Sequence, residues 1–217
     1  MIKILKNTEN AVILVVTPLL TGHTISKETR QSINTNTVPF KWISYEGDGK
    51  HAANVQAGID AYKTQFGTLP PYIQILDRDI ICGRKMLDRL YANLKNLPSN
   101  IAFSYCSFEY RGYINIVFPP KPYNIGQLIT SNYISSNSLY RTCAIEKVGG
   151  FVTETKYHRL SDWAMFLRLY NNGFVGSLCY ETSFIAASSK DDISAGSREE
   201  YIETRKNVLN DFMPKRT

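Results

Sequence analysis

The chain has 217 residues, of which 43% are hydrophobic and 20% are charged. These values exclude a disordered polypeptide and suit one domain with a sizeable core. Its 25 Lys and Arg residues against 19 Asp and Glu residues give a net charge of +6, spread along the sequence without a run of five or six like charges. We therefore expect no nucleic-acid partner, while the charge is compatible with an anionic ligand.

The sequence has no targeting or transmembrane segment and no cysteine cluster. The N-terminus lacks a signal-peptide apolar region, and the longest apolar run, residues 11–16, is too short to cross a bilayer. The four cysteines include no C-x-x-C pair, so we expect reduced, buried thiols and no zinc clip. These features predict a cytoplasmic protein. The C-terminal residues do not mark the end of a fold, so the chain could also be one module of a longer polypeptide.

Strands and helices alternate in the first half of the sequence. Residues 11–17 predict a central strand ended by Pro18, and residues 40–45 predict a second strand. Residues 72–76 predict a third strand, which ends at Asp77. Apolar residues at helical spacing predict one helix before this strand and one after it: Val55, Ile59, Tyr62 and Phe66, then Leu87, Leu90, Leu94 and Leu97. The alternation predicts right-handed crossovers in a largely parallel sheet.

The second half of the sequence predicts three more strands and two helices. Strands are expected at residues 101–108, 113–118 and 174–180, and the prolines within residues 119–122 require a loop. Residues 163–170 have an apolar helical face that ends at the Asn-Asn-Gly sequence of residues 171–173. A final helix begins at a capping box, Ser197 to Glu200.

Two carboxylates follow the third predicted strand. Asp77 and Asp79 are two residues apart, so in an extended chain their side chains point the same way, roughly 6.5 Å apart. Open α/β sheets bind ligands at the carboxyl ends of parallel strands, and oxygen ligands suit Mg²⁺ or Mn²⁺. The pair therefore predicts a divalent-cation site that would neutralise a diphosphate. A solvated, Asp-rich turn without a ligand is the alternative interpretation.

Several segments around this turn follow one another in the order typical of one enzyme family. They are Val15 to Pro18, Trp42 to Glu46, Lys50 to Ile59, Ile75 to Asp79 with its D-x-D sequence, Ile134 to Arg141, Glu146 to Phe151 and Ser161 to Leu169. Each segment is a weak signal by itself, but their order and spacing together are specific. In these segments, which extend over most of the chain, the sequence resembles the family 2 glycosyltransferases of the GT-A fold, and among them enzymes of large DNA viruses, the chloroviruses.

The resemblance implies an α/β GT-A fold with a mixed, mostly parallel sheet flanked by helices. It implies a single domain over residues 1–217, with a nucleotide-binding half at about 1–118 and an acceptor-side half at about 119–217. The implied enzyme uses Mn²⁺ or Mg²⁺ and transfers a sugar from a UDP-sugar, such as UDP-glucose, to a hydroxyl of a glycan or glycoprotein acceptor, with inversion. A viral enzyme of this kind would act in the host cytoplasm.

The resemblance also implies roles for individual residues. The residues that would bind the nucleotide sugar are Thr17, Pro18, Glu46, Lys50, Asn54, Asp77 and Arg78, and those that would hold the metal are Asp79 and Asp77. Asp162 would be the catalytic base that accepts the proton of the acceptor hydroxyl. From the residues alone, Asp162 near the start of a helix has a second explanation, because an acid there stabilises the helix dipole and can cap free N–H groups.

The sequence departs from the family pattern at three points. Glu46 is followed by Gly47 where the family has an acidic pair, and Ser161 stands where an acidic residue usually precedes the base. A late His that completes the metal site in many relatives is missing, so the further ligand would come from water or from His158, Asp191 or Asp192. Residues 121–124 and 133–137 are expected as acceptor-side walls, with ordinary packing as the alternative.

Two other functions remain open. Residues 47–52 match the G-x-G-x-x-A sequence of dinucleotide-binding folds and lie between a predicted strand and helix, as in an NAD-dependent oxidoreductase. However, the match follows the second predicted strand rather than the first, and no hydride-transfer site is recognisable. The departures at Glu46 and Ser161 are also compatible with a carbohydrate-binding module that has lost turnover.

Overall fold

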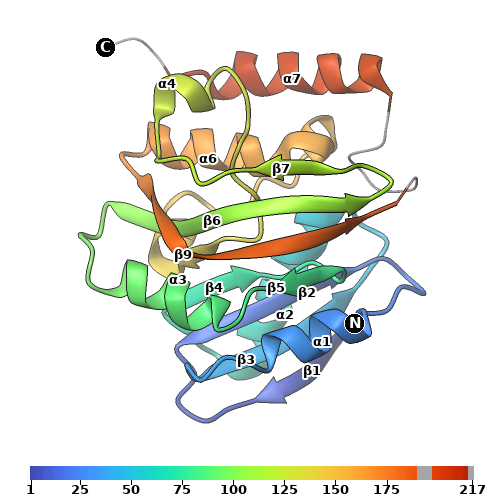
Figure 1. Cartoon of the computed structure of the whole chain (residues 1–217), viewed down its shortest axis with the longest axis vertical. Coiled ribbons are helices and arrows are strands. Elements are labelled where there is room, and N and C mark those ends of the chain that lie inside the picture. The colour runs from blue at the N-terminus through green and yellow to red at the C-terminus, as the bar shows by residue number, and fades with distance from the viewer. Residues whose placement is uncertain (190–196, 215–217) are drawn as a thin grey trace.

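The computed structural model describes residues 1–189 and 197–214 (Figure 1). Its strands are β1 Ile2–Asn7, β2 Ile13–Leu19, β3 Phe40–Glu46, β4 Tyr72–Ile75, β5 Ile80–Cys82, β6 Ile101–Gly112, β7 Ile116–Phe118, β8 Leu139–Arg141 and β9 Val175–Ser188. Its helices are α1 Lys27–Ile33, α2 His51–Phe66, α3 Met86–Lys95, α4 Ile125–Leu128, α5 Thr142–Lys147, the 3-10 helix η1 Thr155–Leu160, α6 Ser161–Asn171 and α7 Arg198–Phe212.

The described strands form one mixed sheet. Their order is β1-β3-β2-β4-β8-β6-β9-β5, with β7 paired to β6. β2 is parallel to β3 and β4, and β6 is parallel to β9, whereas the other five pairings between described strands are antiparallel. The sheet is therefore mixed, as expected, with fewer parallel pairings than the expected majority.

The sheet curls so that one short turn connects distant strands. Only residues 76–79 separate β4 from β5, yet β4 lies in the middle of the strand order and β5 pairs with β9 at its end. In Figure 1 the strands β6, β7 and β9 lie above β2, β4 and β5, with α6 and α7 above them. The turn that carries Asp77 and Asp79 therefore lies where the two parts of the sheet meet.

The core lies on both faces of the central strand β2, all of whose residues are buried. Leu14 and Val16 belong to a cluster that includes apolar residues of α2 and α6. Ile13 and Val15 belong to a second cluster with residues of α1 and α3. A parallel strand covered on both faces needs a continuous apolar sequence, which explains the β-branched run of residues 11–16.

β2 continues two residues beyond the predicted end, because Pro18 lies at a position that needs no donor. In a parallel strand, successive residues bond alternately to the two neighbouring strands. Val16 O accepts from Leu76 N on the β4 side, and Leu19 O accepts from Gly47 N on the β3 side. Pro18 therefore faces the β4 side, where pairing with β4 has already ended at Val16. A missing N–H has no effect on the ladder there.

β9 is longer than predicted. The prediction ended too early because an irregularity in the strand interrupts its apolar pattern. The predicted strand ended at residue 180, but β9 continues to Ser188. Its pairing with β6 shifts register between Leu178 and Ser183, and Tyr180 within this stretch is exposed. The added residues pair with β5 as well as with β6, which closes the curl of the sheet.

The four predicted helices correspond to α2, α3, α6 and α7. Leu97 lies beyond the end of α3, and Ser197 caps α7 by accepting a hydrogen bond from Glu200 N at 3.1 Å. β1, β5, β8 and the short helices α1, α4, α5 and η1 were not predicted. Within residues 1–189 and 197–214, no helix is both long and apolar enough to cross a membrane.

The four cysteines are free thiols, as expected. Cys82, Cys106 and Cys179 are buried, but Cys143 is exposed, so the expectation of burial is wrong for that residue.

Arg141 joins the N-terminal end of β4 to its neighbours. Its Nε donates to Ile101 O at 2.9 Å, and its Nη2 donates to Leu94 O at 2.7 Å and Leu97 O at 2.8 Å. Its Nη1 donates to the Tyr72 hydroxyl at 3.2 Å. One guanidinium therefore satisfies carbonyls at the end of α3 and at the start of β6, beside the strand that ends at Asp77.

We predict that Arg141→Lys lowers the free energy of unfolding by about 2–4 kcal/mol, because one ammonium leaves carbonyls without a donor. Urea denaturation followed by circular dichroism measures this difference. Arg111→Lys is the matched control, since Arg111 is exposed and should change the free energy by less than about 0.5 kcal/mol. Equal stability of the two variants would contradict the assignment.

Candidate active site

A cleft of ≈ 670 Å³ opens beside the C-terminal ends of β2 and β4, within the usual size range of small-ligand sites. It is lined by the end of β2 and the loop after it, the N-terminal end of α2, the turn between β4 and β5, the loop before β8 and the first turn of α6. Seven of the nine predicted site residues line it: Pro18, Lys50, Asn54, Asp77, Arg78, Asp79 and Asp162.

The turn between β4 and β5 is fixed through its backbone. Asp77 N donates to Asn137 Oδ1 at 2.8 Å, and Asn137 Nδ2 donates back to Asp77 Oδ2 at 2.8 Å. The carbonyl of Arg78 accepts from Ser26 N and from the Thr29 hydroxyl, at 2.8 and 2.9 Å. The carbonyl of Asp79 accepts from Ala187 N of β9 at 3.2 Å. The turn is thus held from several elements and presents its side chains in a defined geometry.

His51, the first residue of α2, pairs with Asp77 across the cleft. Its Nε2 lies 2.6 Å from Asp77 Oδ1, and both side chains are about three-quarters buried, with exposed fractions of 23% and 26%. Burial opposes charge on each group, but the mutual attraction prevails: the pKa of His51 is raised by Asp77, with smaller effects of Asp162 and Asp79, and the pKa of Asp77 is lowered by His51 and Asn137. Both shifts favour the ionic form of the pair, an imidazolium and a carboxylate.

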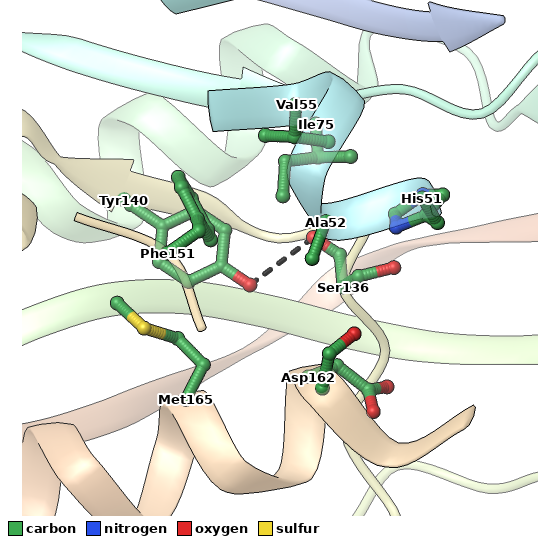
Figure 2. Close-up of a pocket in the computed structure, with 10 residues that line it drawn as sticks. His51, Ala52, Val55, Ile75, Ser136, Tyr140, Phe151, Asp162 and Met165 are labelled. Atoms are coloured by element: carbon green, nitrogen blue, oxygen red, sulfur yellow. Dashed lines mark hydrogen bonds between the residues drawn. The ribbon is translucent and has the colours of Figure 1, made fainter. Parts of the chain in front are cut away.

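Asp162 lies in the first turn of α6, on the opposite side of the cleft from α2 (Figure 2). Its Oδ1 accepts from Trp163 N at 2.7 Å, and its Oδ2 accepts from Asn132 Nδ2 at 3.0 Å. Burial raises the pKa of Asp162 to about 6, although these hydrogen bonds and His51 act against the shift. The bond to Trp163 N fits the helix-cap explanation in part, while the raised pKa gives the carboxyl the properties of a proton acceptor near neutral pH.

Two predicted nucleotide-binding residues do not line the cleft. The Thr17 side chain is completely buried, and its hydroxyl accepts a hydrogen bond from Trp42 Nε1 at 2.9 Å. Glu46 accepts from Gly22 N at 2.9 Å outside the cleft. The core encloses the Thr17 side chain, so a ligand contact at this position would have to come from the backbone beside it, where Pro18 and Leu19 of β2 line the cleft.

Asn54 connects the loops that follow β2 and β3. It is buried, and its Nδ2 donates to Leu19 O at 3.0 Å and to Gly47 O at 2.9 Å. A Cβ atom on Gly47 or Gly49 would lie only 2.9 or 2.7 Å from Asn54 Oδ1. The G-x-G sequence is thus explained by packing against Asn54, without a dinucleotide.

Both carboxylates of the turn, Asp77 and Asp79, line the cleft. The two oxygens of Asp77 contact His51 and Asn137. Within the residues that the structure describes, no group of three or more His, Cys, Asp or Glu side chains could hold a metal ion. A cation at this turn would therefore need phosphate and water for most of its ligands, as Mg²⁺ commonly does.

Of the proposed substitutes for the missing His, only His158 lies among the described residues. His158 lines the cleft, but its Nε2 lies 3.0 Å from Glu200 Oε1 and its Nδ1 lies 3.0 Å from Thr155 O. Because both ring nitrogens face acceptors, neither presents a lone pair to a metal. Asp191 and Asp192 lie outside the described residues.

Of the two expected acceptor-side walls, one lines the cleft. Residues 133–137 line it, whereas residues 121–124 do not. The Tyr133 hydroxyl donates to Pro122 O at 3.2 Å and accepts from Asn124 N at 2.8 Å. Residues 121–124 therefore contact Tyr133 of the wall without lining the cleft themselves.

Comparisons with known proteins identify the fold. No protein-family model and no curated protein sequence matches the chain. Among solved structures, it is similar to TarS of S. aureus, a glycosyltransferase. TarS residues 1–349 in complex with UDP-GlcNAc match with a TM-score of 0.68 at 12% identity, over 91% of this chain and 65% of that chain. The complex with UDP gives 0.64 at 11% identity, over 91% and 64%.

The similarity to TarS extends over only part of the TarS chain. The chain covers less than two thirds of the TarS structures, and 39% of a longer TarS structure, which matches with a TM-score of 0.57 at 14% identity. None of them supports the resemblance to viral enzymes. At such identities the likeness establishes the fold: the chain is an α/β protein with the mixed, curled sheet and flanking helices of the glycosyltransferase TarS.

Proposed function

We propose that the chain is a metal-dependent glycosyltransferase that moves a sugar from a UDP-sugar to a hydroxyl of a glycan or glycoprotein, with inversion. The proposal rests mainly on one observation: a single cleft is lined by Asp79, by Asp162 with its raised pKa, and by the His51–Asp77 pair. The same fold in TarS has been solved with UDP and with UDP-GlcNAc. These observations favour a transferase over an NAD-dependent oxidoreductase.

The N-terminal end of α2 has the electrostatics of a diphosphate site. Lys50 is the N-cap residue, makes no side-chain capping bond and is followed by His51, and the first turn contains no acidic residue. Cations at the positive end of a helix dipole are unfavourable by themselves and become favourable when an anion binds. Lys50 and His51 would therefore attract the diphosphate of a UDP-sugar, which supports the proposed role of Lys50.

Asp162 would act as the base in one displacement. It would accept the proton of the acceptor hydroxyl while the oxygen bonds to the anomeric carbon and the bond from that carbon to the diphosphate oxygen breaks. UDP leaves with the electron pair of that bond. Attack from the face opposite the leaving group would invert the anomeric configuration.

Asp79 would hold Mn²⁺ or Mg²⁺, which when bound would neutralise the charge that develops on the departing diphosphate. Asp77, kept ionised by His51, would then contact the ribose or the sugar rather than the metal.

We predict that UDP binds about tenfold or more tightly with Mn²⁺ than with EDTA, and that Asp79→Asn removes this difference, because the carboxylate charge holds the cation. Isothermal titration calorimetry measures both affinities. Asp60→Asn, an exposed change on α2, is the matched control and should bind like the unmodified chain. The same UDP affinity with and without chelator would overturn the metal site.

We predict that Asp162→Asn lowers kcat for UDP-sugar hydrolysis or transfer by about 10²–10⁴-fold with little change in UDP affinity, because general-base catalysis is lost. In the unmodified enzyme, kcat/KM should fall below pH 6, as a base with a pKa of about 6 becomes protonated. Asn132→Ala should move this decline to higher pH, since the Asn132 hydrogen bond lowers the pKa.

Full turnover by Asp162→Asn would show that another group is the base. UDP binding by the unmodified chain with no turnover of any UDP-sugar would favour the carbohydrate-binding module instead.

A further inference from the structure

A small side pocket lies next to Asp162 at the inner side of the cleft (Figure 2). It shares His51, Ser136, Ser161 and Asp162 with the cleft, so the two spaces meet at these residues. α2 lies on one side of the pocket and α6 on the other. Any sugar held between the α2 N-terminus and Asp162 would lie at its mouth.

Apart from these four residues, the pocket is lined by mainly apolar side chains. Its remaining lining residues are Ala52, Val55, Ile75, Tyr140, Phe151 and Met165. The one hydroxyl among them, that of Tyr140, already donates to Ser136 O at 3.1 Å, as the dashed line in Figure 2 marks. The interior therefore offers no free donor to a polar substituent.

The pocket is also small. Its volume of ≈ 10 Å³ is close to the minimum that holds one water molecule, roughly 10–15 Å³. A group of that size fits and a larger one does not. A hydroxyl in this space would lose its hydration without full compensation, whereas a methyl group would gain by leaving water.

We propose that this pocket is a specificity subsite that selects a donor whose transferred sugar carries a methyl-sized apolar substituent. The inference rests on the proposed function, and it concerns the chemistry of the sugar rather than the binding of UDP. Such a methyl group has two sources, an acetamido group on the ring or a 6-deoxy carbon. A donor with hydroxyls at both places, such as UDP-glucose, would leave the pocket without a suitable group.

The test compares the affinities of UDP, UDP-glucose, UDP-GlcNAc and a UDP-6-deoxyglucose in the presence of Mn²⁺ by calorimetry. We expect UDP-GlcNAc or the 6-deoxy donor to bind about tenfold or more tightly than UDP-glucose, the usual effect of one small apolar group in a matching pocket. Whichever of the two binds more tightly identifies the source of the methyl group.

Two variants change the pocket in opposite directions. Ala52→Val fills it and should reduce the advantage of the methyl-bearing donor to less than about threefold. Ala61→Val, the same change on α2 away from the pocket, is the matched control. Met165→Ala enlarges the pocket and should make an N-propanoyl donor bind at least as tightly as the N-acetyl donor, a result that does not depend on the folding of Ala52→Val.

Equal affinities of all three donors, or tighter binding of UDP-glucose, would overturn the subsite while leaving the proposed function intact, provided that UDP binds. An advantage of the methyl-bearing donor that persists in both pocket variants would also overturn it, because the selection would then occur elsewhere. Failure of UDP itself to bind would reject the proposed function and the subsite together.

Discussion

The arrangement of the cleft depends on the ionic pair between His51 and Asp77. A carboxylate at the end of a buried strand is costly unless it has partners, and here the His51 ring and the Asn137 amide supply them at 2.6 and 2.8 Å. The contacts join the first residue of α2, the end of β4 and the loop before β8 at one point. The spacing between the α2 N-terminus and the turn that carries Asp79 is therefore set by a charged contact rather than by apolar packing alone.

The two central carboxyls of the cleft have opposite electrostatic environments. Asp77 has a lowered pKa because a cation and an amide face it, whereas Asp162 has a pKa raised to about 6 because burial outweighs its hydrogen bonds. Separate pKa values allow one group to stay ionised while the other exchanges a proton. In the proposed reaction, Asp77 would orient the donor and Asp162 would accept the acceptor proton.

The sequence predicted the parts of the site that follow from local pattern. Asp77 and Asp79 could be located because the strand predicted at residues 72–76 ends at them, and the amphipathic stripe of residues 163–170 located the helix of Asp162. His51 was not predicted as a site residue, and Asn137 was expected only as part of an acceptor-side wall, although both lie in segments that carry the family resemblance. Their importance comes from contacts with Asp77 over 26 and 60 residues of sequence, and no periodicity marks such contacts. The burial of the Thr17 side chain could not be predicted, because a strand buried on both faces gives no alternation to show which side chains face a cleft. The end of β9 was missed because a register shift interrupts its apolar pattern.

In the proposed function, a divalent cation bound by Asp79 joins UDP to the turn between β4 and β5. Crystals soaked with UDP and Mn²⁺ and measured by anomalous X-ray scattering at the manganese edge would show whether it does. We expect one manganese peak between an Asp79 carboxylate oxygen and the diphosphate, with Asp77 still paired to His51. A nucleotide bound in the cleft without a peak at Asp79, or a manganese ion at another position, would contradict it.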